Sequence, residues 1–255
     1  FLNNDTTHEP DWLELLINRI KSDENIASVQ PKILDAKQRD HFEYAGGSGG
    51  FLDKYGFPFV RGRIFDTVEK DEGQYDDACP IFWASGTAFI TRKDVFSKMG
   101  GFDVKLFAHF EEIDFHWRCH LAGYSVWVEP ASVIYHLGGG TLHYDSTRKT
   151  YLNHRNSLVM VASHTSMEKL FFVIFVRIFL EKLSILRDIL RGRLGHAWAQ
   201  FKACFWVLFN IGFICRRRKK SNSFRTNFAE DKLYSGIIVL DYFLKGKKTF
   251  SRILK

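Results

Sequence analysis

Hydrophobic and polar positions follow two different rhythms in the first 160 residues. Apolar residues at helical spacing predict three helices, over residues 11–20, 94–99 and 111–122. Short apolar runs predict four strands, over residues 26–30, 82–91, 125–128 and 132–135, with Pro31 ending the first. Strands that alternate with helices predict an α/β domain built in layers.

Residues 46–77 interrupt this alternation. They open with Gly46-Gly47-Ser48-Gly49-Gly50 and continue to Arg61-Gly62-Arg63 in a stretch rich in charged residues. A loop of this length without regular structure is uncommon in a compact domain, and such loops are usually functional lids or disordered segments. The sequence therefore predicts a lid or a disordered loop at this position.

The chain after residue 166 has a helical pattern. Residues 167–194 predict one helix in which Arg177, Glu181, Ser184 and Asp188 share a stripe. The longest uncharged run in this helix is far shorter than the ~20 residues that a membrane-spanning helix needs.

A second helix is expected over residues 195–215, and the five cations Arg216 to Lys220 follow it. An amphipathic helix with a basic flank is typical of an element that lies at a membrane interface. A span interrupted by Lys202 and a helix that packs against a partner subunit are the alternatives. The interfacial interpretation is favoured, which predicts an anionic membrane surface as a partner.

Charge divides the chain at the same place. Residues 1–166 carry a net charge of −6 and residues 167–255 a net charge of +13. This split indicates one half that carries chemistry and another that seeks an anionic surface, with a merely solvated basic tail as the alternative. The four cysteines have neither CxxC nor zinc-site spacing, so free thiols in a reducing compartment are expected.

Polar side chains gather at two candidate positions for metal binding. Asn3-Asn4-Asp5 places a carboxylate beside amides at a turn, which suits a hard divalent cation that also holds diphosphate oxygens. Ordinary turn chemistry explains the same residues. His136 ends an apolar strand before Gly138-Gly139-Gly140, and these glycines allow a ligand or another backbone to approach closely. A satisfied histidine at a strand end is the alternative.

Carboxylates also begin the helix predicted at residue 111. Glu111, Glu112 and Asp114 lie within four residues, and bulky apolar residues such as Phe110 and Trp117 surround them. Favourable charge at a helix N-terminus accounts for part of this pattern. Apolar surroundings would raise the pKa of a carboxylate and make it a better proton acceptor.

These features occur in one order with further short motifs. The motifs are Asn3-Asn4-Asp5-Thr6, Trp83-Ala84-Ser85-Gly86-Thr87-Ala88, Gly100-Gly101-Phe102-Asp103, Phe110-Glu111-Glu112-Ile113-Asp114, Gly123-Tyr124 with Pro130, Tyr135-His136-Leu137-Gly138-Gly139 and Arg155-Asn156. In this order they resemble the GT-A fold glycosyltransferases of family 2, especially the rhamnosyltransferase-like branch that decorates bacterial surface polysaccharides. The resemblance covers roughly residues 1–160.

The resemblance implies a fold and a set of roles. The fold would be α/β: a partial GT-A domain over residues 1–160, followed by a basic, amphipathic α-helical tail over residues 161–255. Mg²⁺ or Mn²⁺ would be bound by Asp5 and His136, with Asn3 contacting it through water. Glu112 would be the catalytic base, with Glu111 and Asp114 as the next candidates.

Donor and acceptor binding would involve a further set of residues under the same resemblance. The set is Trp83, Ser85, Gly86, Trp117 and Arg155. Trp83 and Trp117 offer flat faces on which a sugar could stack, and a place in the hydrophobic core is the alternative for both. Two features depart from the family pattern. The nucleotide-binding βαβ segment that precedes the first motif has no counterpart, so an N-terminally truncated domain is expected, and Glu112 stands where the family usually has Asp.

The function implied is that of an inverting glycosyltransferase. It would move a sugar from a nucleotide-diphosphate sugar to a hydroxyl of a glycan or a lipid-linked glycan, at the inner face of the cytoplasmic membrane. A non-catalytic membrane-docking or scaffold protein is the alternative. Nucleic acid is not an expected partner, because the cations cluster beside apolar helices rather than among spaced aromatic residues. A homo-oligomer is compatible with the helical tail.

Overall fold

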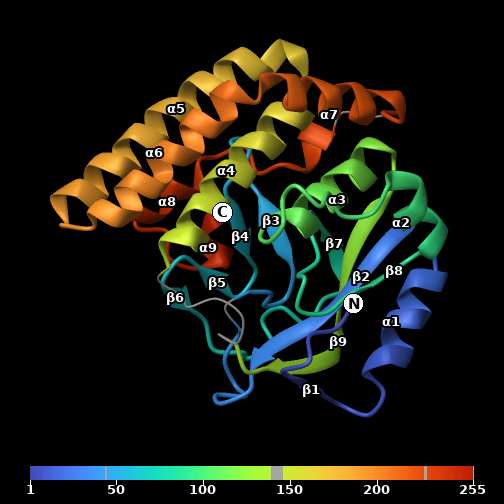
Figure 1. Ribbon diagram of the computed structural model, residues 1–255. Helices are drawn as coiled ribbons and strands as arrows, with labels where there is room; N and C mark the ends of the chain where they lie inside the picture. Colours follow the sequence, from blue (N-terminus) through green and yellow to red (C-terminus); the bar gives the residue numbers. More distant parts are fainter. Residues whose placement is uncertain (44, 139–145, 227–228, 255) are drawn as a thin grey trace.

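A mixed sheet forms the centre of the protein, with helices around it (Figure 1). The computed structural model describes residues 1–43, 45–138, 146–226 and 229–254. The sheet has five strands in the order β1-β9-β2-β8, and β7 also pairs with β9. Their bounds are β1 Thr6–His8, β2 Ile26–Asp35, β7 Cys79–Ile81, β8 Ile90–Thr91 and β9 Ser125–His136. The long strands β2 and β9 run parallel, and the other pairs are antiparallel.

Both long strands continue through a proline, which corrects the prediction that they would stop. Pro31 pairs with Glu129, and the register then shifts so that Lys32 pairs with Val133. A proline cannot donate to a ladder, so inside a sheet it is tolerated at such irregularities. The shift accommodates Pro31 in β2 and Pro130 in β9 together. The two strands predicted over 125–128 and 132–135 are therefore one strand.

Residues 46–77 form a second sheet rather than a lid or a disordered loop, so that prediction is wrong. Four short antiparallel strands follow one another in the order β3-β4-β5-β6. They are β3 Gly50–Leu52, β4 Pro58–Val60, β5 Arg63–Ile64 and β6 Thr67–Val68. Phe42, Phe59 and Ile64 are buried here against the C-terminal helices α8, Ile238–Phe243, and α9, Phe250–Ile253. The end of the chain thus packs back onto the first half.

The three predicted helices of the first half are present. They are α1 Trp12–Lys21, α2 Lys93–Met99 and α3 Glu111–Leu121. Gly100 ends α2 at a positive φ of 81°, as its position after the helix predicted. Of the strand expected over residues 82–91 only its end, β8, is a strand; β7 ends just before the range, and the segment between β7 and β8 is irregular.

Helices dominate the chain after residue 146. They are α4 Thr147–His164, α5 Met167–Leu190, α6 Leu194–Phe209, α7 Ile211–Ser223 and the short 3-10 helix η1 Ala229–Lys232. The helix expected over 195–215 is broken at Asn210, where α6 and α7 meet at 69°. Among the described helices, none is long and apolar enough by itself to cross a membrane, and the bent α6–α7 pair passes such a test by length and composition only. An α/β region followed by helices is therefore confirmed, and the boundary expected at residue 160 lies inside α4.

Candidate active site

Asp5 and His136 lie together although 131 positions separate them. Strand β1 pairs with the end of β9 so that Thr6 faces His136. The Leu137 N–H donates to the Asp5 carbonyl at 3.0 Å, which closes the same corner. His136 Nε2 is 3.2 Å from Asp5 Oδ1. The sheet register thus brings together the two residues that were predicted to bind a metal ion.

Glu43 completes this corner, and the sequence reasoning missed it. Its carboxylate is 4% exposed, and its Oε1 lies 3.2 Å from His136 Nδ1. The backbone N–H of Ala45 donates to the other oxygen at 2.5 Å. Burial opposes protonation of His136, but Glu43 and Asp5 outweigh it and raise the pKa of the imidazole. An acidic residue directly after the buried Phe42 was the available signal.

The geometry of this corner suits a small hard cation in part. Mg²⁺ binds its ligands at about 2.0–2.1 Å in octahedral geometry, which puts neighbouring ligand atoms roughly 3 Å apart. The 3.2 Å between Asp5 and His136 matches that separation. Glu43 lies behind His136 in the way that carboxylates lie behind metal-binding histidines in proteins, where they orient the ring. With a cation bound here, Asp5 and His136 would be its two protein ligands, and substrate phosphates and water would complete the shell.

Asn3 does not join the pair through its side chain. It is exposed, and its backbone N–H donates to the Thr87 carbonyl at 2.9 Å. Within the described residues, no group of three or more His, Cys, Asp or Glu side chains is arranged to hold a metal ion. Of the glycines after His136, Gly139 and Gly140 lie outside the described residues.

Glu111 and Glu112 begin α3 directly after a strained turn. Phe107, His109 and Phe110 have positive φ angles of 66°, 65° and 73°. Residues other than glycine rarely adopt this backbone conformation, and such strained residues are common at functional sites. The turn directs the first two carboxylates of the helix into a partly buried position.

The electrostatics of these two carboxylates favour proton transfer. One oxygen of each, Oε2, is buried and has no hydrogen-bond partner among the described residues. Burial, reinforced by the neighbouring charge of Glu111, raises the pKa of Glu112 to about 8. Burial also raises the pKa of Glu111. Groups with unsatisfied oxygens and raised pKa values in a partly open position are candidates for general acid–base chemistry.

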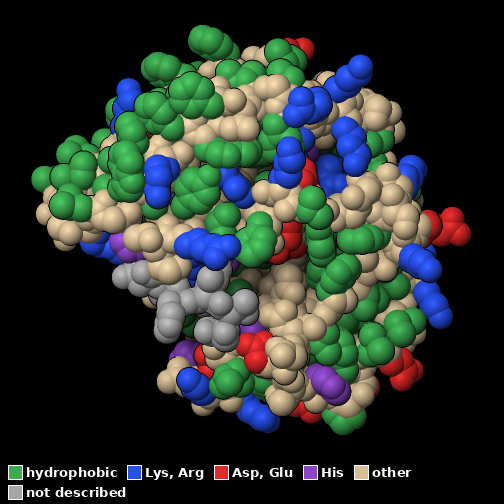
Figure 2. Space-filling model, in the orientation of Figure 1, with side chains coloured by type: hydrophobic (Ala, Val, Ile, Leu, Met, Phe, Trp, Pro, Cys, Tyr) green, Lys and Arg blue, Asp and Glu red, His purple; other side chains and the backbone are tan. Residues whose placement is uncertain are grey.

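Residues 85–87 lie between the two parts of the site. Gly86 is exposed, and a Cβ atom there would be 3.9 Å from the carboxylate carbon of Glu112. The neighbouring Thr87 carbonyl receives the Asn3 N–H, so the chain that leads into Asp5 touches the same segment. Ser85 is buried, and its N–H donates to Gln30 Oε1 at 2.8 Å. On the face shown in Figure 2 the surface is hollowed near its centre, with acidic side chains visible at the hollow.

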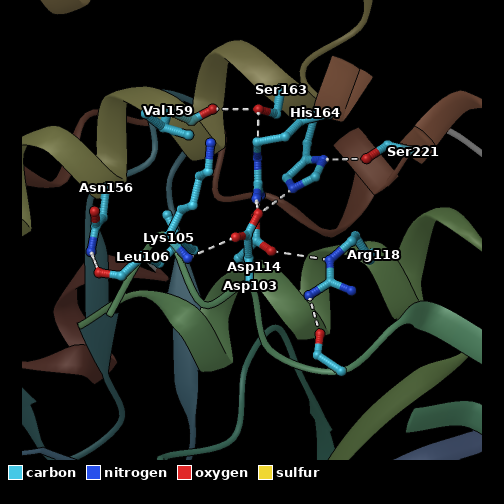
Figure 3. Close-up of polar contacts among 12 residues, drawn as sticks. Asp103, Lys105, Leu106, Asp114, Arg118, Asn156, Val159, Ser163, His164 and Ser221 are labelled. Carbon is cyan, nitrogen blue, oxygen red and sulfur yellow. Dashed lines mark hydrogen bonds and ion pairs between the residues drawn. The ribbon is translucent and has the colours of Figure 1, made fainter. Parts of the chain in front are cut away.

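Arg155 and Asn156 hold the strained turn before Glu111, and Figure 3 shows Asn156 directed at Leu106. Arg155 donates to the carbonyls of Lys105 and Leu106 at 2.9 and 3.0 Å. Asn156 Nδ2 donates to the carbonyls of Leu106, Ala108 and His109 at 2.7–2.9 Å. The pair therefore positions the segment before Glu111, and substrate binding by Arg155 remains a prediction.

Both tryptophans belong to the core, so sugar stacking on them is not supported. Trp83 is 5% exposed and its Nε1 donates to the Phe51 carbonyl at 2.9 Å. Trp117 is 1% exposed and packs edge-on against Phe82. Sequence patterns around an aromatic residue do not show whether its ring will lie in the core or at the surface.

Asp114 belongs to a buried ion-pair network and is excluded as a base. It is completely buried and bound by Arg118 at 3.0 Å, by His164 Nε2 at 2.7 Å and by Arg217 (Figure 3). Burial opposes its ionisation, but Arg217 and Arg118 outweigh this and hold the pKa of Asp114 far below its usual range. A carboxylate with such a low pKa is a poor proton acceptor.

The same network includes part of the basic cluster 216–220. Arg217 on α7 also binds Asp103, and its Nε donates to Ser163 Oγ at 3.2 Å. Arg218 donates to the Ala162 carbonyl at 2.7 Å. Two of the five cations therefore hold α7 on the rest of the fold, Arg217 on the α/β region and Arg218 on α4, and are not available to an outside surface.

Known proteins support the resemblance to glycosyltransferases. No protein-family model matches the chain. Two strains of Mycobacterium tuberculosis, CDC 1551 / Oshkosh and ATCC 25618 / H37Rv, have a protein named N-acetylglucosaminyl-diphospho-decaprenol L-rhamnosyltransferase that is 28% identical to this chain over 110 residues. The match covers 43% of this chain and 36% of the relative, so the chain spans about a third of the length of these relatives.

A solved structure of GalNAc-T7 with UDP, GalNAc and Mn²⁺ aligns with 66% of this chain and 32% of its own. The TM-score is 0.47 and the identity is 16%. The similarity of this chain to rhamnosyltransferases thus rests on the sequence match.

Proposed function

We propose that this chain carries the acceptor and metal side of an inverting glycosyltransferase that uses a nucleotide-diphosphate sugar. The observation that carries the proposal is the Glu111–Glu112 pair, whose buried oxygens have no partner among the described residues and whose pKa values are raised. A purely structural helix start would not gain from two such carboxylates, because an unsatisfied buried oxygen costs stability. The pair therefore favours an enzyme over the non-catalytic docking or scaffold alternative.

In the proposed reaction the ionised form of Glu112, whose fraction grows as pH rises toward its raised pKa of about 8, takes the proton from an acceptor hydroxyl. The acceptor oxygen forms a bond to the anomeric carbon as the bond from that carbon to the diphosphate oxygen breaks, and the diphosphate leaves with the electron pair. One such displacement inverts the anomeric configuration. Asp5 and His136 would hold Mg²⁺ or Mn²⁺, which when bound neutralises charge on the departing diphosphate.

The names of the relatives suggest the substrates to test. An L-rhamnosyltransferase that acts on an N-acetylglucosaminyl-diphospho lipid points to a nucleotide-diphospho-rhamnose donor and a lipid-linked acceptor. Such an acceptor would be met at the inner face of the cytoplasmic membrane, where we place the protein. The nucleotide is left open in the assay by using uridine, guanosine and deoxythymidine diphosphate forms.

Transfer is measured in the intact protein with Mg²⁺ or Mn²⁺ added after chelation. Glu112→Gln keeps the size of the side chain and removes the proton acceptor, so the rate should fall by about 10²–10⁴-fold. Donor binding should change little, because the predicted metal and phosphate contacts are retained. Transfer by Glu112→Gln at the wild-type rate would show that the base is elsewhere, and Glu111→Gln then becomes the next variant to assay.

A further inference from the structure

Helix α5, Met167–Leu190, buries three of its charged residues and exposes several of its large apolar residues. Arg177, Glu181 and Asp188 are only 1–3% exposed, whereas Phe171 and Phe175 are 88% and 69% exposed. A helix on the surface of a soluble protein normally turns its apolar stripe to the core and its charges to water. Ionisable residues that face the protein interior while phenylalanines are exposed are typical of helices in contact with lipid.

Specific contacts of the charged stripe set this orientation. Arg177 donates to Glu181 at 2.7 Å and to the Tyr55 carbonyl at 3.1 Å. Glu181 also contacts His154 Nδ1 at 2.5 Å. Asp188 accepts a hydrogen bond from Gln200 of α6 at 2.6 Å. Turning the helix to hide its phenylalanines would break the contacts to Tyr55, His154 and Gln200, so the apolar stripe stays outside.

Helix α6 extends the same apolar surface, which we call the α5–α6 face. Its exposed residues recur every three or four positions: Leu194, Trp198, Phe201, Phe205, Leu208 and Phe209. Successive rings contact each other, with centroids 5.4 Å apart for Trp198 and Phe201 and 4.5 Å for Phe201 and Phe205. Figure 2 shows hydrophobic side chains gathered over α5 and α6. An exposed apolar surface of this continuity marks an interaction site.

The charges around the face indicate what covers it. From residue 167 to residue 223, eight Lys and Arg residues are exposed and one acidic residue, Glu168, is exposed. The eight are Lys169, Lys182, Arg187, Arg191, Lys202, Arg216, Lys219 and Lys220. A second copy of the same face would bring like charges together, which is unfavourable. Anionic lipid headgroups complement both the cations and the apolar rings.

We propose that the α5–α6 face docks on an anionic phospholipid surface. The aromatic side chains enter the boundary between headgroups and acyl chains, and Lys182 and Lys202 extend from the face to lipid phosphates. This surface replaces the basic cluster 216–220 as the main membrane contact, because two cations of that cluster are used inside the fold.

The docked face would lie next to the candidate active site. Arg155, which holds the turn before Glu111, lies 5.1 Å from the Trp206 ring of α6. A groove of about 500 Å³ opens at the same place, lined by Tyr151, Lys202, Phe205, Trp206, Phe209 and Asn210. Together with the proposed function, this placement would present a lipid-linked acceptor to Glu112.

Vesicle flotation of the full 255-residue chain tests the docking surface. Vesicles of phosphatidylcholine alone are compared with vesicles of phosphatidylcholine and phosphatidylglycerol in equal parts. The wild-type chain should float with the anionic vesicles. Phe171→Ser with Phe175→Ser should lower the partition coefficient roughly ten-fold or more, because each buried phenyl ring contributes strongly to transfer from water. Leu13→Ser on α1, 42% exposed and distant from α5 in Figure 1, is the matched control and should bind as wild type.

A charge variant tests the same surface without touching the apolar residues. Lys182→Gln with Lys202→Gln should weaken binding to anionic vesicles roughly ten-fold and should reduce its sensitivity to salt. Circular dichroism confirms that each variant is folded. Glu112→Gln should float as wild type does, so loss of sugar transfer with retained vesicle binding would count against the proposed function alone.

Three results would overturn the docking proposal. The first is absence of wild-type binding to anionic vesicles. The second is flotation of the phenylalanine variant at the wild-type level. The third is a dimer in analytical ultracentrifugation that dissociates in the phenylalanine variant while vesicle binding is absent, which would make the face an interface between two copies of the chain.

Discussion

Replacing Arg217 by methionine should destabilise the protein strongly, because this side chain joins the C-terminal helices to the α/β region. Arg217 lies on α7, has a side chain 9% exposed and binds Asp103 and Asp114. Asp114 is completely buried. Methionine keeps most of the volume and removes the charge, which leaves Asp114 with two partners instead of three.

The size of the destabilisation depends on the ion-pair partners that Asp114 keeps in the variant. Removing one partner of a buried ion pair costs about 3–5 kcal/mol. Arg118 at 3.0 Å and His164 at 2.7 Å still compensate the carboxylate, so the lower end, about 3 kcal/mol, is expected for the free energy of unfolding. For a protein of this size that corresponds to a fall in Tm of about 6–12 °C.

Thermal unfolding followed by circular dichroism at pH 7 measures this fall. Arg216→Met is the matched control, because Arg216 is the exposed neighbour on the same helix and a surface substitution usually changes stability by less than about 0.5 kcal/mol. The network depresses the pKa of Asp114, so its contribution is fully present above the unfolded pKa of 3.8 and is lost only as pH falls further. The difference between the two variants should therefore persist from pH 8 to about pH 4.5. Equal Tm values for Arg217→Met and Arg216→Met would refute the reasoning.

Two further predictions concern the candidate active site. The folded state raises the pKa of Glu112 from 4.5 to about 8, so the folded protein binds an extra proton between these pH values and its stability falls as pH rises through them. Glu112→Gln should therefore be more stable than wild type at pH 8 by about 1–3 kcal/mol. Urea unfolding at pH 8 and at pH 4.5 checks this, and the gain should be smaller at the lower pH. Glu43→Gln should weaken Mn²⁺ binding about 10–100-fold, because Glu43 orients His136. Titration calorimetry with Mn²⁺ alone measures the change, and Glu9→Gln, at an exposed position, is the control. An unaltered affinity would show that Glu43 does not support a metal ligand.

Local pattern was sufficient for the helices and for part of the site. Helices near residues 12–21, 93–99 and 111–121 follow from apolar spacing and from the glycine after Met99, which are local properties. Asp5 and His136 were predicted to approach each other from the family resemblance, and the register of β1 and β9 places them 3.2 Å apart. Their role as metal ligands remains a prediction, as does the role of Glu112.

Other features depended on partners far away in the chain. The strand through Pro31 exists because β9 carries a matching irregularity about 100 positions later. Residues 46–77 form a sheet because α8 and α9, near the end of the chain, cover its apolar side. Local composition shows neither partner. Pro31 therefore predicted the end of a strand, and the glycines of residues 46–50 predicted a loop.

The sequence by itself determined which residues of α5 share a stripe, and the tertiary structure decided which way that stripe faces. Periodicity specifies relative positions around a helix axis, so Arg177, Glu181 and Asp188 had to lie on one side. These charges have buried partners because His154, Tyr55 and Gln200 of other elements bind them in the folded protein, and the phenylalanines on the other side of α5 therefore face outward. Arg217 is a second case: its place in a basic run predicted a surface contact, but the fold places Asp103 and Asp114 beside it. The free energy of a charge depends on its partners, and the fold supplies them.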